Sequence, residues 1–545
     1  MTILLRQPSD LRPSDHYDQW LAVGGIDPTV LNLPADRMMP NVAGALEQAF
    51  EDSRELWWDI GRILAGQPTA GISHAAACAS FGSDFGLMLA WDHLVRSAGD
   101  GKTIALAVCE DPYLFRHLSG ISEVDAGRPP GMQIRRLRAG ARGVVARISV
   151  GLRVARVALE RRRDREIYTA GAPALMVYGH PGSTATGHDV YFGDLLSRFT
   201  EVWRVLHADC GRNRARELTT GMRTVSVHAW GNPLYAIFRL PLIRWRPSPT
   251  DPLCRKYTWL IRRSAAIENS GGGPAMTRWQ QHCQGKWLAA VRPRAVAWPW
   301  ENFSWERALV RMARTKGIAT IGYQHTVIGP HQFNYSVRCN PDGLGSVPDV
   351  IAADGPAYRQ EMIDWGLEAE RVVDGGSFRI TEPGRRTPHG TDAPVFMALS
   401  ANLKIAARQI DISYRLAAHG KKIAIKQHPM YPVTFVENEN LFRTETPMAD
   451  FQKLSCVVYC TGASALDALL AGLPSVRLRF ADQVSINVLP KNIGGAVADT
   501  DSISDFVNNP SQPSDIVWRD LFSPVDYGLW AKLLQTTTRP ESGVD

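Results

Sequence analysis

The sequence lacks the features that mark membrane-spanning and secreted proteins. The 545-residue chain has no run of about 18 apolar residues, whereas a membrane-spanning helix needs about 20. The opening residues, MTILLRQPSDLRPSD, contain no apolar core of signal-peptide length. The eight cysteines are scattered and none forms a CxxC pair, so we expect neither a disulfide framework nor a zinc site of that type. These absences predict a cytoplasmic protein.

Signatures of several enzyme and nucleic-acid-binding classes are also absent. The sequence has no GxSxG turn, Walker A loop or GxGxxG fingerprint, and no zinc finger, helix-turn-helix or RRM pattern. His180, His188, Asp189 and Asp194 lie in one segment, but no HxH or HExxH spacing supports a metal site. We therefore expect no metal, no cofactor and no nucleic-acid partner.

Strand and helix patterns alternate along most of the chain, which predicts an α/β fold with parallel sheets. The apolar share of 45% and the charged share of 21% are those of a folded protein. Short apolar runs predict strands at Thr103–Val108, Ala174–Tyr178, Ala295–Pro299, Ile318–Tyr323, Asp349–Ala352, Val395–Leu399, Lys422–Lys426, Cys456–Tyr459 and Ser475–Leu478. Helices are predicted at Met276–Val291, Ser304–Thr315, Ala463–Ala471 and Tyr527–Leu534.

The length is too great for one core, so we expect two Rossmann-like domains that face each other across a cleft. The junction is placed in the Gly/Pro-rich run Asn340–Pro348. The predicted units are an N-terminal extension (1–65), a first Rossmann-like domain (66–340), a second one (341–515), and a C-terminal helix and tail (516–545) that packs across the first domain.

A basic amphipathic helix is predicted as an insertion at residues 132–166, in a chain whose net charge is +7. Eleven arginines occur between Ile134 and Arg165, against Glu160 and Asp164. Apolar residues recur there at helical spacing: Leu137, Ala141, Val144, Val145, Ile148, Leu152, Ala155 and Leu159. Such a helix, with Gly151 as a candidate break, can lie on an anionic membrane surface. A solvated surface and an arginine patch for nucleic acid are the alternatives.

A second apolar and basic segment, Leu234–Pro247, places Trp245 between Arg244 and Arg246. An indole beside cations is typical of an anchor at a membrane interface. The two segments together predict a peripheral protein at the inner face of the cytoplasmic membrane.

The most informative segment is Lys422–Leu478, which contains KKIAIKQHP and CVVYCTGASALDALLAGLPSVRL. Its first strand ends at His428, and its second passes through Thr461, Gly462 and Ser464 into a helix. Ligands bind beyond the carboxyl ends of parallel strands, and a Gly/Ser turn at a helix start presents free N–H groups to an anion. We therefore expect a phosphate site, with His428 on the neighbouring strand donating to the same anion. An ordinary βαβ unit is the alternative.

Two further strand ends carry candidates for acid–base chemistry. Glu301 and Glu306 follow the strand Ala295–Pro299, where a carboxylate can take a proton from a hydroxyl group. Glu306 can instead stabilise the first turn of its own helix. His325 and His331 follow the next strand, and a satisfied core histidine is the alternative for each.

These motifs resemble glycosyltransferases of the GT-B fold. KQHP (Lys426–Pro429) is similar to the HP motif of bacterial sialyltransferases, polysialyltransferases and Kdo transferases, in which the histidine supports the phosphate of a CMP-sugar. TGASA (Thr461–Ala465) falls where these families place a serine-containing phosphate motif. The resemblance implies that Asp467 contacts the nucleotide ribose, and it implies phosphate contacts from Lys426, His428, Pro429, Thr461, Gly462 and Ser464.

The earlier motifs are similar to those of bacterial surface-carbohydrate biosynthesis transferases of the capsule and O-antigen type. They are DVYFGDL (Asp189–Leu195), ENFSWE (Glu301–Glu306), GYQHTVIG (Gly322–Gly329), PDVIAADG and GGSFR. The resemblance spans roughly residues 174 to 478 and implies an acceptor domain followed by a nucleotide-sugar domain. The acidic-acidic-Gly motif of sialyltransferases is missing, since Asp354-Gly355 supplies only half of it. The donor nucleotide and the identity of the base therefore stay open.

The resemblance implies a metal-independent glycosyltransferase that moves a sugar to a surface glycan or a lipid-linked acceptor. A CMP-linked acidic sugar is the first expected donor and a UDP-sugar the second. The acceptor proton would go to Glu301, or else to Asp189 or His325. The alternatives are a nucleotide-sugar epimerase or polyol-phosphate transferase on the same scaffold, and a non-catalytic scaffold for polysaccharide assembly.

Overall fold

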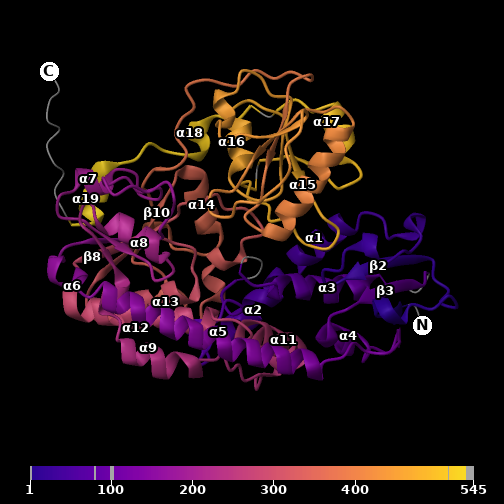
Figure 1. The fold of residues 1–545 in the computed structure, drawn as a ribbon, viewed down its shortest axis with the longest axis horizontal. Helices are drawn as coiled ribbons and strands as arrows, with labels where there is room; N and C mark the ends of the chain where they lie inside the picture. The colour runs from indigo at the N-terminus through magenta and orange to yellow at the C-terminus, as the bar shows by residue number, and fades with distance from the viewer. Residues whose placement is uncertain (1–2, 79–81, 99–102, 492, 514, 536–545) are drawn as a thin grey trace.

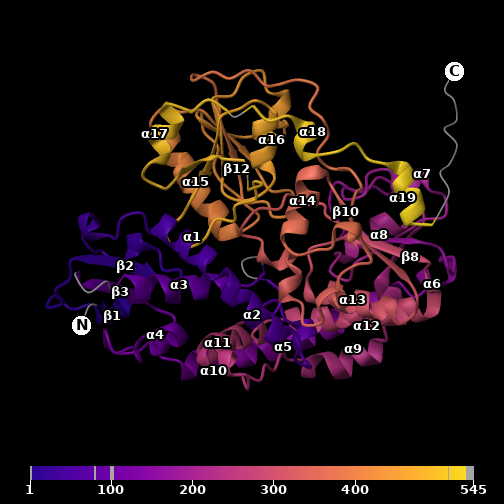
Figure 2. The same cartoon turned by 180° about the vertical axis from the view of Figure 1, so that it is seen from behind.

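A computed structural model describes residues 3–78, 82–98, 103–491, 493–513 and 515–535, and within these ranges the chain forms three parallel β-sheets. Residues 1–2 of the expected extension and 536–545 of the expected tail lie outside the described residues. Figure 1 shows the three units that the sheets define, and Figure 2 shows them from behind. We call them the N-terminal lobe (3–130), the middle lobe (131–380 with 515–535) and the C-terminal lobe (385–513).

The N-terminal lobe contains a four-stranded sheet in the order β2-β3-β1-β4. Its strands are β1 (Ile3–Arg6), β2 (Gln19–Val23), β3 (Ala105–Cys109) and β4 (Val124–Ala126). Its helices are α1 (Val42–Asp52), α2 (Arg54–Ala65), α3 (Phe85–Ser97) and α4 (Pro112–Leu118). The central strand β1 pairs with both β3 and β4. Residues 3–65, the described part of the expected extension, therefore share one folded unit with residues up to about 130.

The middle lobe contains a seven-stranded sheet in the order β11-β10-β9-β8-β5-β6-β7. Its strands are β5 (Ala174–Val177), β6 (Trp203–Leu206), β7 (Thr224–Ser226), β8 (Ala295–Pro299), β9 (Ala319–Tyr323), β10 (Val350–Ala353) and β11 (Val372–Asp374). Its helices are α5 (Gln133–Glu160), α6 (Asp164–Ile167), α7 (Leu195–Arg198), α8 (Arg212–Thr219), α9 (Pro233–Arg239), α10 (Pro252–Lys256), α11 (Thr258–Asn269), α12 (Gly273–Val291), α13 (Ser304–Arg314) and α14 (Pro356–Asp364). Because β10 and β11 belong to this sheet, the expected junction at 340–348 falls inside the middle lobe.

The C-terminal lobe contains a six-stranded sheet in the order β14-β13-β12-β15-β16-β17. Its strands are β12 (Val395–Ala398), β13 (Ile423–Lys426), β14 (Leu441–Arg443), β15 (Cys456–Tyr459), β16 (Ser475–Leu478) and β17 (Ala496–Ala498). Its helices are α15 (Leu403–Ala418), α16 (Ser464–Leu470) and α17 (Ile503–Asn508). The order is 3-2-1-4-5-6, that of a dinucleotide-type Rossmann sheet. Strand β12 therefore separates β13 from β15, and the expectation that the two motif strands are neighbours is wrong.

The predicted α/β class is confirmed, since every strand pair in the two larger sheets is parallel. These two sheets form the Rossmann-like units of a GT-B-like arrangement, and the N-terminal lobe is a third unit beside them. The predicted strands match the observed ones within about two residues because their buried apolar runs are bounded by polar or small residues. The C-terminal lobe lies above the other two in the view of Figure 1.

The chain returns from the C-terminal lobe to the middle lobe through α18 (Trp518–Leu521) and α19 (Tyr527–Leu533). Trp530 of α19 is fully buried, and its indole N–H donates to the carbonyl of Gly375 at 3.0 Å. Its ring packs edge-on against Phe192, with ring centroids 5.7 Å apart. The expectation that the last helix packs across the first Rossmann-like domain is confirmed.

A buried ionic joint connects all three lobes. Glu47 of α1 accepts hydrogen bonds from Arg477 of β16 and from Arg479. His331 of the middle lobe lies 2.8 Å from Glu51 and accepts from the backbone N–H of Asn487 at 2.9 Å. His331 is only 1% exposed, so it serves this joint and does not face a ligand.

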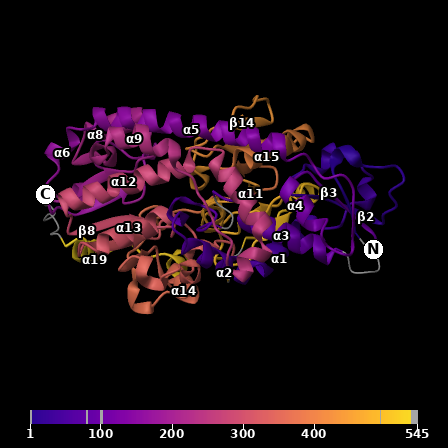
Figure 3. The ribbon, with the colours of Figure 1, turned by 90° about the horizontal axis from the view of Figure 1, so that it is seen from below.

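The basic helix α5 connects the N-terminal lobe to the middle lobe and is continuous over 28 residues, without the break considered at Gly151. Gly151 is buried against α9, where a Cβ would lie 2.6 Å from the carbonyl oxygen of Ala236. The helix packs through glycines, alanines and the valines Val150, Val154 and Val157. It leaves its other large apolar side chains exposed: Ile134, Leu137, Val144, Val145, Ile148, Leu152 and Leu159. Figure 3 shows α5 and α9 side by side on one face of the molecule.

The expectation that Trp245 is an interfacial anchor is wrong. Trp245 is 1% exposed and packs in the core of the N-terminal lobe and α11. Its backbone N–H and C=O are both bonded to the side-chain amide of Asn269, which turns the indole inward. The exposed apolar residues of this segment lie earlier, at Leu234, Phe238 and Leu242. No helix of the described residues is long and apolar enough to cross a bilayer.

Candidate functional site

The carboxyl ends of the middle and C-terminal sheets carry polar groups that converge around Arg379. This residue follows β11, and its side chain is exposed. Its guanidinium donates to the carbonyl oxygen of His325 at 3.1 Å and lies 5.8 Å from the ring centre of Tyr191. Burial lowers the pKa of His428 in the C-terminal lobe, and the Arg379 charge lowers it further. Burial raises the pKa of Asp467 in the same lobe, and the Arg379 charge opposes that rise. Arg379 is therefore a cation that both walls of the cleft share.

Glu301 lies directly beyond β8 on the middle-lobe wall. Its backbone N–H donates to Glu306 at 2.9 Å and its carbonyl accepts from Asn334 at 2.7 Å, so the loop is fixed from both sides. The side chain is 23% exposed. Burial raises the pKa of Glu301 to about 7, although Arg379 acts in the opposite direction. A carboxyl group that titrates near neutral pH is suited to general-base catalysis.

Glu306 stabilises this loop from below. It is fully buried, and its Oε2 accepts from the backbone N–H groups of Glu301 and Asn302. Burial raises the pKa of Glu306 well above its usual value, and the nearby Glu301 raises it further. The structure therefore supports a positioning role for Glu306, which is the second of the two interpretations that the sequence left open.

His325 lies beside Glu301, with 3.7 Å between its Nε2 and the Glu301 Oε1. This separation exceeds a direct hydrogen bond. The imidazole packs edge-on against Tyr191 at 5.1 Å between ring centroids. Burial and the charge of Arg379 lower the pKa of His325 to about 3, so the ring is neutral at physiological pH. A base this weak is poorly matched to proton abstraction.

His180 adds a second neutral imidazole to the middle-lobe wall. Its Nδ1 accepts from the N–H of Gly182 at 3.0 Å, which leaves the ring hydrogen on Nε2. Burial lowers the pKa of His180 to about 4, and the charges of Arg379 and His428 contribute.

Asp189 does not reach the cleft as a free base. It is 1% exposed, and its carboxylate accepts from Ser183 Oγ at 3.1 Å and from the N–H of Tyr191 at 3.0 Å. The buried guanidinium of Arg204 lies 3.7 Å away. Because its oxygens are occupied, Asp189 holds the loop that presents Tyr191 to His325 and Arg379. We therefore assign it a structural role in place of the expected catalytic one.

His428 lies beyond β13 on the C-terminal wall and is partly exposed. Its Nδ1 accepts from the N–H of Met430 at 3.2 Å, so the neutral ring carries its hydrogen on Nε2. Burial lowers the pKa of His428, and Arg379 adds to that effect. The ring packs against Tyr431 at 5.4 Å between centroids. The free Nε2–H is a donor for an anion at this strand end.

Thr461 and Gly462 form the turn beyond β15, at the point where the strand order reverses. Gly462 has φ +109°, a backbone conformation that favours glycine, and a Cβ there would meet nothing within 4 Å. Thr461 Oγ1 lies 2.9 Å from Ser400 Oγ, in the loop beyond the adjacent β12. Open α/β sheets bind ligands at such a reversal. Ser464 begins α16, whose seven residues give it a short dipole.

The separation of β13 from β15 changes how these groups can act. Two strand spacings place the backbones of the two strand ends roughly 10 Å apart. His428 and the Thr461 turn therefore cannot hold the same phosphate oxygen, as the sequence suggested. Ser400 and Asn402 occupy the intervening position, beyond β12. One extended nucleotide can contact both strand ends.

The remaining expected contacts have different surroundings. The Asp467 side chain reaches solvent. Partial desolvation by the surrounding protein raises its pKa to about 6, and the charge of Arg379 acts in the opposite direction. Lys426 is bonded to Glu445, with Nζ 2.7 Å from both the carbonyl and Oε2 of that residue, and so is turned to the sheet edge. Pro429 is exposed and follows His428.

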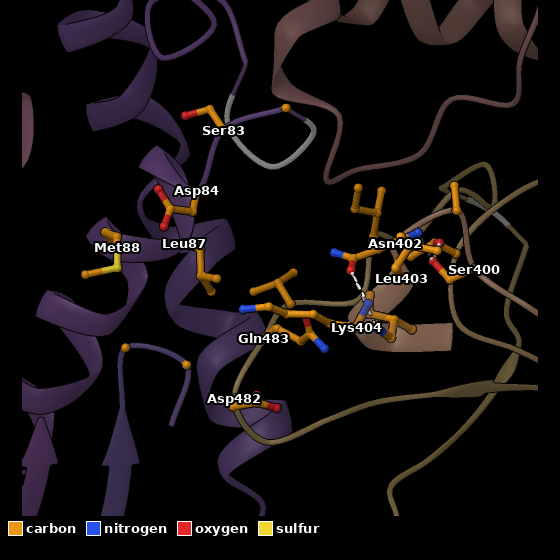
Figure 4. A pocket seen from close by; sticks show the side chains of 18 of the residues that line it. Ser83, Asp84, Leu87, Met88, Ser400, Asn402, Leu403, Lys404, Asp482 and Gln483 are labelled. Carbon is orange, nitrogen blue, oxygen red and sulfur yellow. Dashed lines mark hydrogen bonds between the residues drawn. The ribbon is translucent and has the colours of Figure 1, made fainter. Parts of the chain in front are cut away.

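A cavity of about 1000 Å³ opens at the strand reversal, between the C-terminal and N-terminal lobes. Thr461, Ser400 and Tyr431 line the end nearest the phosphate-type turn. Figure 4 shows Asp84, Leu87 and Met88 of the N-terminal lobe on one side and Asn402, Leu403, Lys404 and Gln483 of the C-terminal lobe on the other. The cavity is at the upper end of the range for small-molecule sites. Sequence reasoning missed it because residues from widely separated segments form its walls.

Sequence reasoning also missed the role of Arg379, although it quoted the GGSFR motif. Asp354, half of the missing acidic motif, is fully buried and accepts from the Tyr323 hydroxyl at 2.5 Å. Gly355 follows it because a Cβ there would lie 2.4 Å from Cα of Phe522 in the returning chain. The Asp-Gly pair thus has a packing explanation. Within the described residues no group of three or more His, Cys, Asp or Glu side chains could hold a metal ion.

Three comparisons with known proteins were informative to different degrees. No protein-family model and no curated protein matches the chain. Among solved structures, it is similar to the lipopolysaccharide outer core galactosyltransferase WaaB (9% identity, TM-score 0.31, 62% of this chain and 88% of that one). It is also similar to MurG of Acinetobacter baumannii (12%, 0.33, 62% and 89%) and to a UDP-N-acetylglucosamine 2-epimerase (10%, 0.33, 68% and 92%).

Proposed function

We propose that this protein is a glycosyltransferase that moves a sugar from a nucleotide donor to a hydroxyl acceptor, without a metal ion. The observation that carries the proposal is the meeting, around Arg379, of a carboxyl group with pKa near 7 on one wall and a neutral imidazole donor on the other. An acid–base group and an anion-binding group on opposite walls are what sugar transfer from a nucleotide requires.

The donor phosphates bind along the strand ends of the C-terminal lobe. The hydroxyls of Thr461 and Ser400 and the turn at Gly462 contact one part of the nucleotide, and the Nε2–H of His428 contacts another. Arg379 supplies the full positive charge that stabilises the departing phosphate. Asp467 is the proposed contact for the ribose, and Ser464 and Pro429 flank the two phosphate contacts. Lys426 contributes only if it leaves Glu445.

Glu301 is the proposed general base. The acceptor hydroxyl gives its proton to the Glu301 carboxylate as its oxygen forms a bond to the anomeric carbon of the donor. The bond from that carbon to the phosphate oxygen breaks, and the electron pair leaves with the nucleotide. His428 and Arg379 stabilise that charge. His325 is a neutral neighbour that orients Glu301, and Asp189 acts through Tyr191.

The cavity beyond Thr461 is the proposed space for the rest of the donor. Its volume of about 1000 Å³ accommodates a nucleotide sugar. A CMP-linked acidic sugar remains the first proposed donor, from the similarity of KQHP to the HP motif, and a UDP-sugar the second. The N-terminal lobe would then contribute to donor selection through Asp84 and Met88.

The proposed acceptor is a surface glycan or glycolipid at the inner face of the cytoplasmic membrane. Support comes from the exposed apolar side chains of α5 and α9, two helices that lie side by side (Figure 3), and from the many arginines of α5. We name the residues Leu137, Val145, Ile148, Leu152, Phe238 and Leu242 the apolar face. Apolar insertion combined with cationic attraction is the general mode of peripheral binding to anionic bilayers. A lipid-linked acceptor would be concentrated at such a surface.

A thermal-shift series with CMP, UDP, GDP and CDP tests the nucleotide site. A ligand at 100 times its Kd stabilises the folded state by about 2.7 kcal/mol, so the correct nucleotide gives a clear shift that His428→Ala diminishes. Transfer of labelled sugar to a lipid extract, with release of the same nucleotide, then establishes the reaction. Release of an altered sugar without any acceptor would instead identify an epimerase. Absence of a shift with all four nucleotides would overturn the proposal.

A further inference from the structure

A pocket of about 460 Å³ lies between α5 and α11, and none of the proposed catalytic or nucleotide-binding residues lines it. Three arginines line it: Arg136 of α5, Arg262 of α11, and Arg244 from the segment after α9. The rest of the lining includes small or apolar residues such as Gly140 and Ala265. We name this site the arginine pocket.

The charge of the arginine pocket is not balanced within the described chain. No carboxylate is among its lining residues, and none of the three guanidinium groups is ion-paired with a described Asp or Glu. The adjacent Arg135 differs, since it is bonded to Glu110 at 2.9 Å. Arg136 is held over the ring of Tyr113, 5.7 Å from its centre. Three cations gathered without a counter-charge favour an anionic ligand.

A fourth arginine, Arg147, connects two chain segments beside the pocket by hydrogen bonds. Arg147 of α5 is 1% exposed and donates to the carbonyls of Pro241 and Asn269, at 3.1 and 2.8 Å. Burial lowers the pKa of Arg147, and repulsion from Arg244 lowers it further. Asn269 ends α11 and lines the pocket. The positive groups are thus fixed close together, and an anion bound there would relieve their repulsion.

The neighbouring surface indicates what kind of molecule carries the anion. Ile134 and Leu137, on the same helical turn as Arg136, are 67% and 76% exposed. Farther along the same face, Leu152 and Phe238 are 58% and 67% exposed. Free phosphate offers nothing apolar to these side chains, and nucleic-acid bases stack on aromatic rings, whereas three of these four side chains are aliphatic. A lipid offers a phosphate to the pocket and acyl chains to its surroundings.

We propose that the arginine pocket binds the phosphate group of an anionic membrane lipid and so fixes the orientation of the protein on the bilayer. The proposal rests on the membrane-facing role given to α5 and α9 above. It adds a discrete headgroup site to what would otherwise be diffuse attraction. A fixed orientation holds the opening of the catalytic cleft at a constant height above the membrane.

Flotation with phosphatidylcholine vesicles, with and without phosphatidylglycerol, tests the site in the full-length protein. The pocket variant is R136Q/R262Q. The matched control is R138Q/R153Q, which removes the same charge from exposed positions of α5 outside the pocket. A pocket that makes charge-assisted hydrogen bonds predicts about tenfold weaker binding for the pocket variant than for the control. Phe238→Asp should weaken binding to both kinds of vesicle.

The possible outcomes separate the pocket from the rest of the argument. Equal loss in the pocket and control variants would overturn the pocket while leaving the membrane face intact. Absence of vesicle binding by the folded wild type would overturn both, whereas a nucleotide thermal shift in that sample would still support the catalytic cleft. Binding of poly(U) that is tighter than binding to the anionic vesicles, and that the pocket variant loses and the control keeps, would show that RNA is the ligand, against the proposal.

Discussion

Replacing Glu301 by Gln should lower activity and raise stability together. The substitution keeps the shape of the side chain, and the Glu301 carboxylate makes no hydrogen bond that Gln would lose within the described chain, since the neutral His325 ring lies 3.7 Å away. Loss of a general base typically lowers kcat by about 10² to 10⁴. The wild-type kcat/KM, which reports the free enzyme, should rise about tenfold from pH 6 to pH 8, because a carboxyl group of pKa about 7 must be ionised. The variant should lose that dependence.

The stability effect follows from the same pKa. The folded state holds the Glu301 proton to about pH 7, whereas the unfolded chain releases it near the usual value of 4.5. The folded state therefore binds more protons between these values, and the free energy of unfolding falls as pH rises through this window. A shift of this size corresponds to at most about 3 kcal/mol, and solvent contact at the cleft reduces it to about 1–2 kcal/mol.

Urea denaturation of both proteins at about pH 4.5 and about pH 8 measures this effect. The two midpoints should nearly coincide at the lower pH, and the variant should be the more stable at the higher. Initial rates of nucleotide release, measured on the same samples, give the activity. A variant that keeps wild-type turnover would show that Glu301 is not the base. A variant that is less stable at pH 8 would show that the ionised carboxylate supports the fold.

Three other substitutions separate binding groups from structural ones. His428→Ala should weaken nucleotide binding about 10- to 100-fold, as measured by isothermal titration, because a hydrogen bond to a charged group is lost. The urea midpoint should stay unchanged, because the hydrogen bond that the ring accepts within the described chain comes from Met430. Asp189→Asn should destabilise the protein by about 3–5 kcal/mol, because Arg204 would stay buried without a charged partner. Turnover per folded molecule should stay within a few-fold of wild type. A loss of turnover without a loss of stability would make Asp189 a candidate base again. Glu47→Gln should cost a similar amount by leaving Arg477 unpaired at the joint between the lobes, and a midpoint equal to that of wild type would show that the joint carries no stability.

The sequence predicted strands β5, β8, β9, β10, β12, β13, β15 and β16 because these runs are apolar and buried, and it missed β6, β7, β11, β14 and β17. Runs such as Ala295–Pro299 and Cys456–Tyr459 are continuously buried and end at polar or glycine-rich turns. Such runs can be predicted from the local sequence alone. The four-residue strand β1 cannot be predicted in this way, since its partners β3 and β4 are about a hundred residues away. The local sequence of residues 1–65 therefore predicts an extension and not a part of a folded lobe.

Strand order and side-chain direction could not be obtained from the sequence. Nothing local shows that β12 lies between β13 and β15, so His428 and Thr461 were expected at one phosphate. Trp245 has the surroundings of an interfacial anchor in sequence, yet its backbone bonds to Asn269 turn it inward. Glu301 and Asp189 are alike as carboxylates beyond strands. Only the tertiary contacts show that one is available and the other is occupied.

The charges of the cleft lead to one more measurable consequence. Before a ligand binds, burial favours the neutral forms of Glu301, His325 and His428, and Arg379 carries the lasting charge. A nucleotide phosphate brings negative charge next to Arg379 and competes with Glu301 for it. The pKa of Glu301 should therefore be higher in the complex than in the free enzyme. The pH profile of kcat reports the complex and that of kcat/KM the free enzyme, so the kcat profile should have its midpoint at the higher pH. The opposite order would mean that the donor phosphate binds away from Arg379, and the proposed placement of the donor between the two walls would then be wrong.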